Sequence, residues 1–288
     1  MRARIKLFDI AANLTYKTLR PNLEAILKRA RTHGVEKFLI LGSCLEESKK
    51  SYDFSLLYSN TYCSAGVHPC QALKPQEDKD YFSELEKIIK EAKKDKLVAI
   101  GECGLDYDRL SLADKDSQLK VFPEHFELAK KYNLPMYFHA RNAETDFYKI
   151  VSENRSKFST GVVHSFTGSL DLLKKLLDMG LYIGVNGCSL KTDNNISVIK
   201  QIPLDRLLLE TDAPFCKITK KSPVYKLIKT HFKQKKVTSE DPYTIMSGRN
   251  EPCTLIQVLE VVAVLKGLEG KALAKIVWNN SLKLFNIT

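Results

Sequence analysis

The 288-residue sequence has no apolar run that approaches the roughly 20 residues of a membrane-spanning helix, so we expect no membrane span. Residues 1–6 are basic, but Asp9 interrupts the apolar stretch behind them. This disfavours a secretory signal and leaves a short targeting role open. With 44% hydrophobic and 27% charged residues, the composition is that of an ordinary globular protein.

No C-x-x-C pair occurs among the seven cysteines, which are scattered and odd in number. This pattern favours a reducing compartment, cytoplasmic or nuclear, in which most of the thiols are small buried groups. Cys103 directly follows Glu102 and is itself a conceivable metal ligand. Because neighbours in a strand point to opposite faces, we expect Cys103 to face away from Glu102.

The chain also lacks a low-complexity linker or a break in composition, so we interpret residues 1–288 as one domain. Apolar runs of strand length alternate with amphipathic, charge-rich stretches, which is typical of repeated βα units. Strands are predicted at residues 7–11, 37–41, 62–67, 98–102, 136–139, 161–164, 181–185 and 207–210. Helices are predicted near residues 22–32, 46–58, 81–94, 117–132, 146–154, 170–179, 195–201, 254–265 and 271–285.

This alternation predicts an α/β fold of the (β/α)8, or TIM-barrel, type. A doubly wound open sheet is the alternative, but no Gly-rich dinucleotide-binding fingerprint follows the first predicted strand. We accordingly expect no organic cofactor. The Lys-rich segment 214–246 separates the last strand from its helix, and a loop of that length is usually functional or disordered. In a barrel it emerges at the carboxyl face of the strands.

Four polar residues stand at the ends of different predicted strands. Glu102, His139 and His164 end the fourth, fifth and sixth, and Asp212 follows the eighth. Each alone has a structural explanation, but βα loops converge at one mouth, where all four can meet. Imidazoles and carboxylates bind zinc, manganese or iron, whereas oxygen-rich sites suit magnesium or manganese. The pattern therefore predicts one or two divalent metal ions at this face, able to hold a phosphodiester for attack by water.

Further candidates surround this predicted mouth. His68 ends the third strand and is a candidate for phosphate contact, general acid catalysis or support of the metals, the alternative being a turn histidine before proline. Arg249 is a candidate phosphate clamp that Glu251 would orient. Arg141 is a similar candidate, with a simple surface salt bridge as its alternative.

Seven motifs in order along the chain together resemble the TatD-type deoxyribonucleases of the amidohydrolase superfamily. They are FDIAANLT at residues 8–15, AGVHP at 65–69, AIGECGLD at 99–106, FHARN at 138–142, HSFTG at 164–168, ETDAP at 210–214 and RNEP at 249–252. The stretch YIGVNGCSLKT at residues 182–192 is further similar to the eukaryotic branch, the TatD-domain-containing 1 type.

The resemblance implies metal-dependent hydrolysis of DNA phosphodiester bonds, by 3′-to-5′ exonuclease or endonuclease action, and a role in DNA repair or in DNA fragmentation during cell death. It implies that the metal ligands are Glu102, His139, His164 and Asp212. The residues expected to orient the metal ligands without binding the metal themselves are Asp9, Asn13 and Glu251.

The first strand departs from the pattern of many superfamily members, which carry His-x-His there. Ala11 and Asn13 stand at the matching positions, and neither replaces an imidazole. Our hypothesis is that one ion is held by Glu102, His139 and His164. A second ion would be held by Glu102 and Asp212, mainly through water. Such a water-rich site favours magnesium, with manganese or zinc as alternatives.

In the mechanism that we expect, Asp212 orients or deprotonates the attacking water, and Glu102 and His68 complete the catalytic set. The net charge of +11, from 45 Lys and Arg against 34 Asp and Glu, favours a polyanionic partner, although a Lys-rich proteome or a need for solubility would also explain it. DNA is the expected partner. No base-reading motif is visible, so sequence preference should be weak, and backbone affinity from the segment 214–246 should fall with salt.

Two other functions are compatible with the same residues. A metal-dependent ester or amide hydrolase, such as an aminoacyl-tRNA deacylase, would use the same ligands. A nucleic-acid-binding scaffold with a silent site is disfavoured by the complete set of four candidate ligands. An amidohydrolase with a carbamylated lysine fits poorly, because the fourth strand carries Glu102 in place of a lysine.

Overall fold

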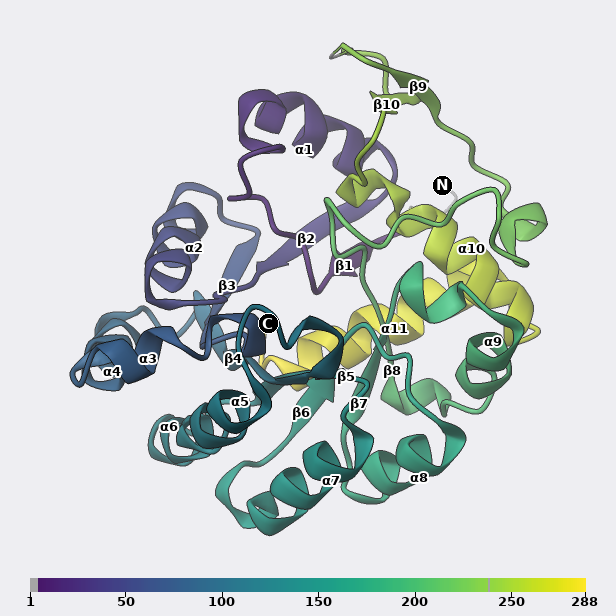
Figure 1. Cartoon of the computed structure of the whole chain (residues 1–288). Helices are drawn as coiled ribbons and strands as arrows, with labels where there is room; N and C mark the ends of the chain where they lie inside the picture. Colours follow the sequence, from purple (N-terminus) through teal and green to yellow (C-terminus); the bar gives the residue numbers. More distant parts are fainter. Residues whose placement is uncertain (1–4, 238) are drawn as a thin grey trace.

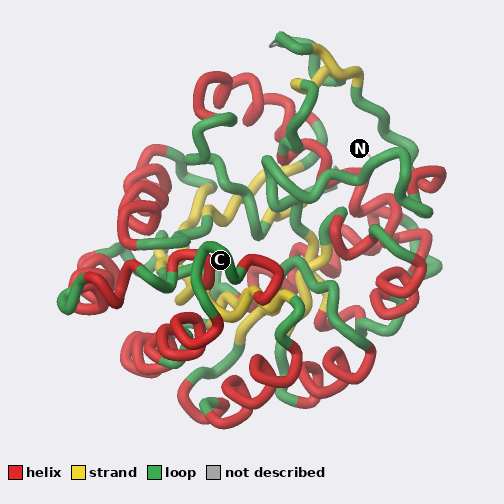
Figure 2. Tube along the Cα trace, in the orientation of Figure 1, coloured by secondary structure: helices red, strands yellow, loops and turns green. Residues whose placement is uncertain are grey.

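The computed structural model describes residues 5–237 and 239–288, so most of the basic start at residues 1–6 lies outside it. Eight parallel strands follow one another around a central sheet in the order β1 to β8, and the helices surround them (Figures 1 and 2). The strands are β1 (Leu7–Asp9), β2 (Val35–Ile40), β3 (Thr61–Ala65), β4 (Leu97–Asp106), β5 (Met136–Arg141), β6 (Gly161–Val163), β7 (Tyr182–Val185) and β8 (Leu207–Leu209). This order confirms the predicted (β/α)8 barrel over the doubly wound sheet.

The helices alternate with the strands as the sequence predicts. They are α1 (Leu23–Thr32), α2 (Leu45–Leu57), α3 (Lys74–Glu77), α4 (Tyr81–Glu91), α5 (Lys115–Val121), α6 (Glu124–Tyr132), α7 (Glu144–Glu153), α8 (Leu170–Asp178), α9 (Asp193–Ile199), α10 (Leu255–Leu265) and α11 (Gly270–Leu284). The helix expected over residues 117–132 is two helices, α5 and α6, because Pro123 lies between them and cannot donate a backbone hydrogen bond. In the described part of the chain, no helix is both long and apolar enough to cross a membrane.

The barrel closes where β8 meets β1. An isolated parallel bridge pairs Ala12 with Ala213, and the amide of Asn13 donates to the carbonyl of Ala213 at 3.0 Å. The buried carboxyl group of Asp9 accepts hydrogen bonds from the backbone amide of Thr211 at 2.9 Å and from its hydroxyl at 2.5 Å. The two strands whose ends carry candidate site residues are therefore fixed to each other.

Alternate residues of a strand serve two separate apolar layers. Met136 and Phe138 of β5 belong to the cluster that packs against the surrounding helices, whereas Tyr137 between them belongs to a second cluster. The hydroxyl of Tyr137 donates to the carbonyl of Ile10, so this side chain crosses the barrel toward β1. The second layer fills the barrel interior below the mouth and gives the site a rigid floor.

The Lys-rich segment 214–246 contains two short strands, β9 (Lys233–Lys235) and β10 (Thr244–Met246), which pair in parallel. In Figure 1 they lie beside α1. The ring of His33 contacts both Phe232 and Tyr243, with centroids 4.8 and 5.0 Å away. These contacts anchor the segment to α1 at one side of the barrel mouth.

That the whole chain forms one domain stays a prediction.

Candidate active site

Strand β4 contains one extra residue relative to β5 at the position of Glu102, which is a β-bulge. Ile100 pairs with Met136, but the next pair along β4 and β5 is Cys103 with Phe138, so β4 has three steps where β5 has two. Cys103 lies in the apolar cluster between strands and helices, which confirms that it faces away from Glu102. The expected end of this strand at Glu102 was wrong, because pairing with β5 continues to Asp106.

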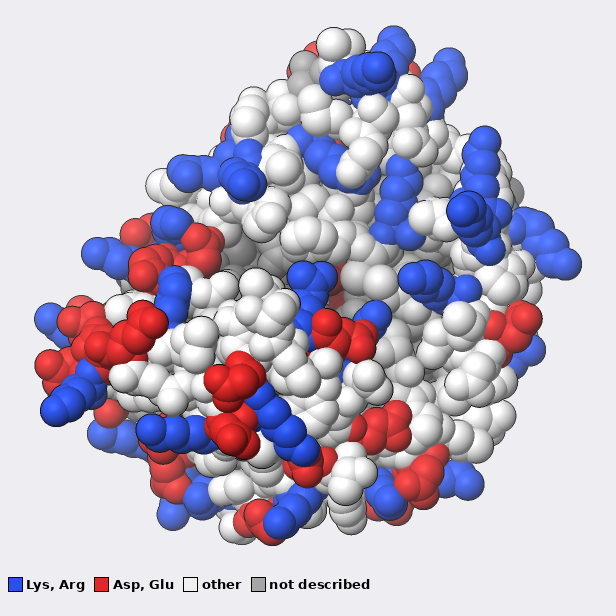
Figure 3. Space-filling model, in the orientation of Figure 1, with Lys and Arg blue, Asp and Glu red and all other residues white. Residues whose placement is uncertain are grey.

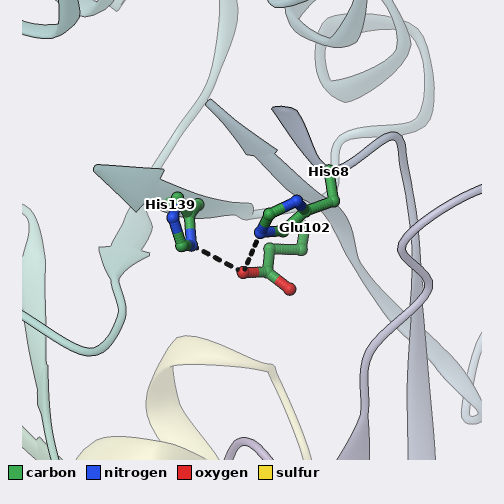
Figure 4. A group of neighbouring side chains, drawn as sticks. All are labelled: His68, Glu102 and His139. Atoms are coloured by element: carbon green, nitrogen blue, oxygen red, sulfur yellow. Dashed lines mark hydrogen bonds and ion pairs between the residues drawn. The ribbon is translucent and has the colours of Figure 1, made fainter. Parts of the chain in front are cut away.

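One oxygen of Glu102 is the point on which three imidazoles converge. Its Oε1 lies 2.7 Å from His164 Nε2, 2.9 Å from His139 Nδ1 and 3.5 Å from His68 Nε2. Figure 4 shows the rings of His68 and His139 directed at this oxygen. The structure thus brings together three of the four predicted metal ligands, with His68 beside them.

Both predicted histidine ligands have a carboxylate on the ring nitrogen that faces away from Glu102. His139 Nε2 lies 3.2 Å from Asp106 Oδ2, and His164 Nδ1 lies 3.3 Å from Glu210 Oε1. Metal-bound histidines usually have such a partner, which fixes the orientation and tautomer of the ring. The arrangement therefore fits a metal centre.

Asp106 and Glu210 are site residues that the sequence analysis did not single out, although both lie within its motifs. The signal for Asp106 was its position four residues after Glu102, on the same face of an extended strand. Glu210 also accepts hydrogen bonds from the backbone amide of Ser165 at 2.7 Å and from the amide of Asn186 at 2.9 Å. It therefore holds together the ends of β6, β7 and β8.

The charges in this cluster shift the pKa values of its members in opposite directions. Burial favours the protonated form of Glu102, but His164, His68 and His139 outweigh it and hold the pKa of this carboxyl well below its ordinary value. Burial opposes charge on His164, yet Glu102 and Glu210 raise its pKa well above the ordinary range. A divalent cation would replace such protons, because a ligating imidazole must be neutral.

Asp212 follows β8 at the closure of the barrel, near enough to His164 and Glu102 to interact with their charges. Its Oδ1 accepts a hydrogen bond from the side-chain amide of Asn13 at 3.0 Å, and its Oδ2 accepts one from the Cys216 thiol at 3.3 Å. Burial raises the pKa of Asp212 to about 6. Asp9 binds the preceding residue, Thr211, so Asp9 and Asn13 both lie where they can position Asp212.

His68 is neutral near pH 7, since burial lowers its pKa to about 4. Its Nδ1 accepts a hydrogen bond from the backbone amide of Cys70 at 3.0 Å, which leaves the ring proton on Nε2. One ligand atom from each of His68, Glu102 and His139 lies within 4.8 Å of the others, and the same holds for His68, Cys70 and Asp106. These donor sets support a divalent metal at the mouth.

The two predicted phosphate-binding arginines have partners within the protein. Arg249 donates to the carbonyl of Thr18 and, at 3.2 Å, to Glu251 Oε1, and its Nε has no partner among the described residues. Arg141 donates to Asp108 Oδ2 at 2.8 Å in a partly exposed pair. Each therefore forms an ion pair with an acid, and their roles as phosphate contacts stay predictions.

Two open cavities flank the mouth. One of about 570 Å³ lies between the Lys-rich segment and the loop after β7, and its walls include Lys191, Lys217 and Arg249. The other, of about 540 Å³, includes Arg141 and Lys191. Figure 3 shows Lys and Arg gathered on the part of this face that the Lys-rich segment covers. A polyanion would meet favourable charge there.

A parallel (β/α)8 barrel with imidazoles and carboxylates at its mouth defines a class of hydrolases. The chain belongs to the TatD related DNase family, whose model matches residues 8–286. This confirms the resemblance seen in the motifs and the prediction of a hydrolytic enzyme.

Full-length relatives agree with this assignment. The chain is 38% identical to "Deoxyribonuclease Tat-D" of Schizosaccharomyces pombe, over 98% of this chain and 96% of that one. It is 33% identical to "3'-5' ssDNA/RNA exonuclease TatD" of Pantoea ananatis, over 98% of this chain and 100% of that one. The structure of a TatD family hydrolase from Entamoeba histolytica is similar with a TM-score of 0.89 and 30% identity, covering 99% of both chains.

Proposed function

We propose that the protein is a divalent-metal-dependent deoxyribonuclease that hydrolyses DNA phosphodiester bonds, as a 3′-5′ exonuclease, an endonuclease or both. The observation that carries the proposal is the convergence of three imidazoles on Glu102, with carboxylates behind His139 and His164. Family membership and the names of the relatives support DNA as the substrate. A role in DNA repair or fragmentation, in the nucleus or cytoplasm, belongs to the same proposal.

Each residue of the site has a chemical role in this proposal. Glu102, His139 and His164 hold the metal, which when bound polarises the phosphodiester and makes water a better nucleophile. Asp212 orients the attacking water and accepts its proton, because a pKa of about 6 suits a base near neutral pH. Neutral His68 donates from Nε2 to a phosphate oxygen. Magnesium is the metal that we favour, since part of the site would be filled by water.

Two exposed aromatic rings at the mouth support a nucleic-acid substrate. The backbone amide of Tyr16 donates to the carbonyl of Asn13, and that of Phe215 donates to the carbonyl of Asp212. Asn13 and Asp212 are themselves hydrogen-bonded, so the two turns place Tyr16 and Phe215 edge to face, with centroids 5.3 Å apart. The two residues are 38% and 49% exposed, so their aromatic faces are open to a ligand. An unpaired base can stack there.

Phe215→Ala should lower kcat/KM on single-stranded DNA by about 5- to 100-fold, the range expected for the loss of one base–aromatic stack. Phe215→Tyr should retain most of the activity, because it keeps an aromatic face. A strand with abasic 3′-terminal nucleotides should be cut equally well by the wild type and by Phe215→Ala. An equal loss on normal and abasic strands would contradict stacking and would indicate a general disturbance of the loop that holds Asp212.

Cleavage of DNA by chelator-stripped protein, with magnesium, manganese or zinc added back, tests the proposed function itself. We expect metal-restored cutting of a 3′-labelled linear strand, and a circular strand separates endonuclease from exonuclease action. Cutting should weaken as salt rises, because contacts from lysines to the DNA backbone release counterions. Hydrolysis of aminoacyl-tRNA without any cutting of DNA would replace the proposal with the deacylase alternative.

A further inference from the structure

Two thiols face each other at the rim of the candidate active site. Cys188 begins the short helix η5 (Cys188–Leu190) in the loop after β7, and Cys216 lies in the loop after β8. All seven cysteines are free, and both members of this pair are half-buried. Their sulfur atoms lie 2.9 Å apart. Neither thiol belongs to the cluster around Glu102.

The two loops are held together independently of the thiols. Gly187 packs so closely on the second loop that a Cβ atom there would lie 2.0 Å from the carbonyl oxygen of Cys216. Within the loop after β7, the side chain of Asn186 accepts a hydrogen bond from the backbone amide of Cys188 at 2.9 Å and fixes the position of Cys188. The contact between the sulfurs is therefore a product of the packed backbone, which brings both thiols within reach of one bond.

The pair is accessible to small molecules. Cys188 lines both cavities beside the mouth, and Cys216 lines the larger one. The thiol of Cys216 lowers the pKa of Cys188 to about 7 despite burial, and the charges of Arg141 and Lys191 act in the same direction. Cys188 is therefore the better nucleophile of the two, since the thiolate is the reactive form.

We propose that Cys188 and Cys216 form a reversible disulfide that makes the candidate active site sensitive to disulfide oxidants. The Cys188 thiolate attacks one sulfur of a small-molecule disulfide and expels the first thiolate. The Cys216 sulfur then attacks the Cys188 sulfur, and the second sulfur of the oxidant leaves as a thiol that takes up the proton given up by Cys216. In total the two cysteines lose two protons and two electrons, and the oxidant becomes two thiols.

The disulfide would act on Asp212, to which we assign the role of general base. The Cys216 thiol donates to Asp212 Oδ2 at 3.3 Å, and oxidation removes this donor. It also draws the Cys216 sulfur toward Cys188 and fixes the loop that carries Phe215. We therefore expect the oxidised protein to be slower. This consequence rests on the proposed function, whereas formation of the disulfide does not.

Treating the full-length, chelator-stripped protein with glutathione disulfide, and then alkylating the remaining free thiols, tests the site. Mass spectrometry should show the loss of two hydrogen atoms and a peptide pair joined through Cys188 and Cys216, both reversed by dithiothreitol. Cys188→Ser and Cys216→Ser should abolish the joined pair, whereas Cys70→Ser, at the third half-buried cysteine, should keep it. Separate alkylation of Cys188 and Cys216, or a glutathione adduct that persists on either, would overturn the proposal.

The same samples measure the consequence for activity. Oxidised wild-type protein should cut single-stranded DNA about tenfold more slowly, as expected for the loss of one hydrogen bond to a charged acceptor. Dithiothreitol should restore the rate, and Cys188→Ser should not respond to the oxidant. Inhibition that persists in Cys188→Ser would overturn the switch. If no preparation cuts DNA, the mass measurement still decides whether the disulfide forms.

Discussion

Replacing Glu102 by glutamine is expected to reduce metal-dependent DNA cleavage by a factor on the order of 10³, because it removes the one anion on which three imidazoles converge. Glutamine keeps the size of the side chain, but it turns an acceptor-only group into one that also donates. Single-turnover cleavage of a 3′-labelled single strand measures the effect. Metal titration of the stripped wild type by calorimetry should show one tight and one weak site, and Glu102→Gln should lose the tight one.

Two matched variants separate this loss from unfolding. Glu91→Gln changes an exposed glutamate of α4 and should leave cleavage unaltered. Glu102→Asp keeps the negative charge but draws it back by one methylene, so it should retain more metal affinity than Glu102→Gln. A Glu102→Gln protein that is folded and cleaves within about tenfold of the wild type would remove Glu102 from the centre of the site.

Arg29→Met is expected to lower the free energy of unfolding by about 3–5 kcal/mol, the cost of leaving one member of a buried ion pair without its partner. Arg29 Nε donates to Glu251 Oε2 at 2.9 Å, and the two side chains are only 3% and 0% exposed. The guanidinium of Arg29 also donates to the carbonyl of Ser239. The substitution therefore loosens the Lys-rich segment from α1 as well. Urea denaturation followed by circular dichroism measures the change.

Lys28→Met is the control on the same helix. Lys28 pairs with Glu240 at 3.5 Å, but the two side chains are 71% and 78% exposed, so this variant should change stability by less than about 1 kcal/mol. If Lys28→Met and Arg29→Met lowered the free energy of unfolding equally, burial of the Arg29–Glu251 pair would not explain the loss of stability.

The barrel and the ends of its strands could be predicted because they follow from local patterns. Apolar runs of strand length alternate with amphipathic stretches, and a polar residue at the end of such a run must lie at one edge of a parallel barrel. Glu102, His139 and His164 were found in this way. Local patterns failed at β4, where pairing with β5 continues past Glu102 to Asp106. Gly104 permits that close pairing, since a Cβ atom there would lie 1.9 Å from the His139 carbonyl oxygen.

The sequence by itself determined which residue types stand at the strand ends, and with them the fold, the family and the kind of chemistry. The tertiary structure alone decided which atoms meet. It made Glu102 the centre of the cluster, set Asp106 and Glu210 behind the histidines, and brought the Cys188 and Cys216 sulfurs together. The physical reason is that strand periodicity depends on near neighbours, whereas these contacts join different strands and loops through the register of the closed barrel.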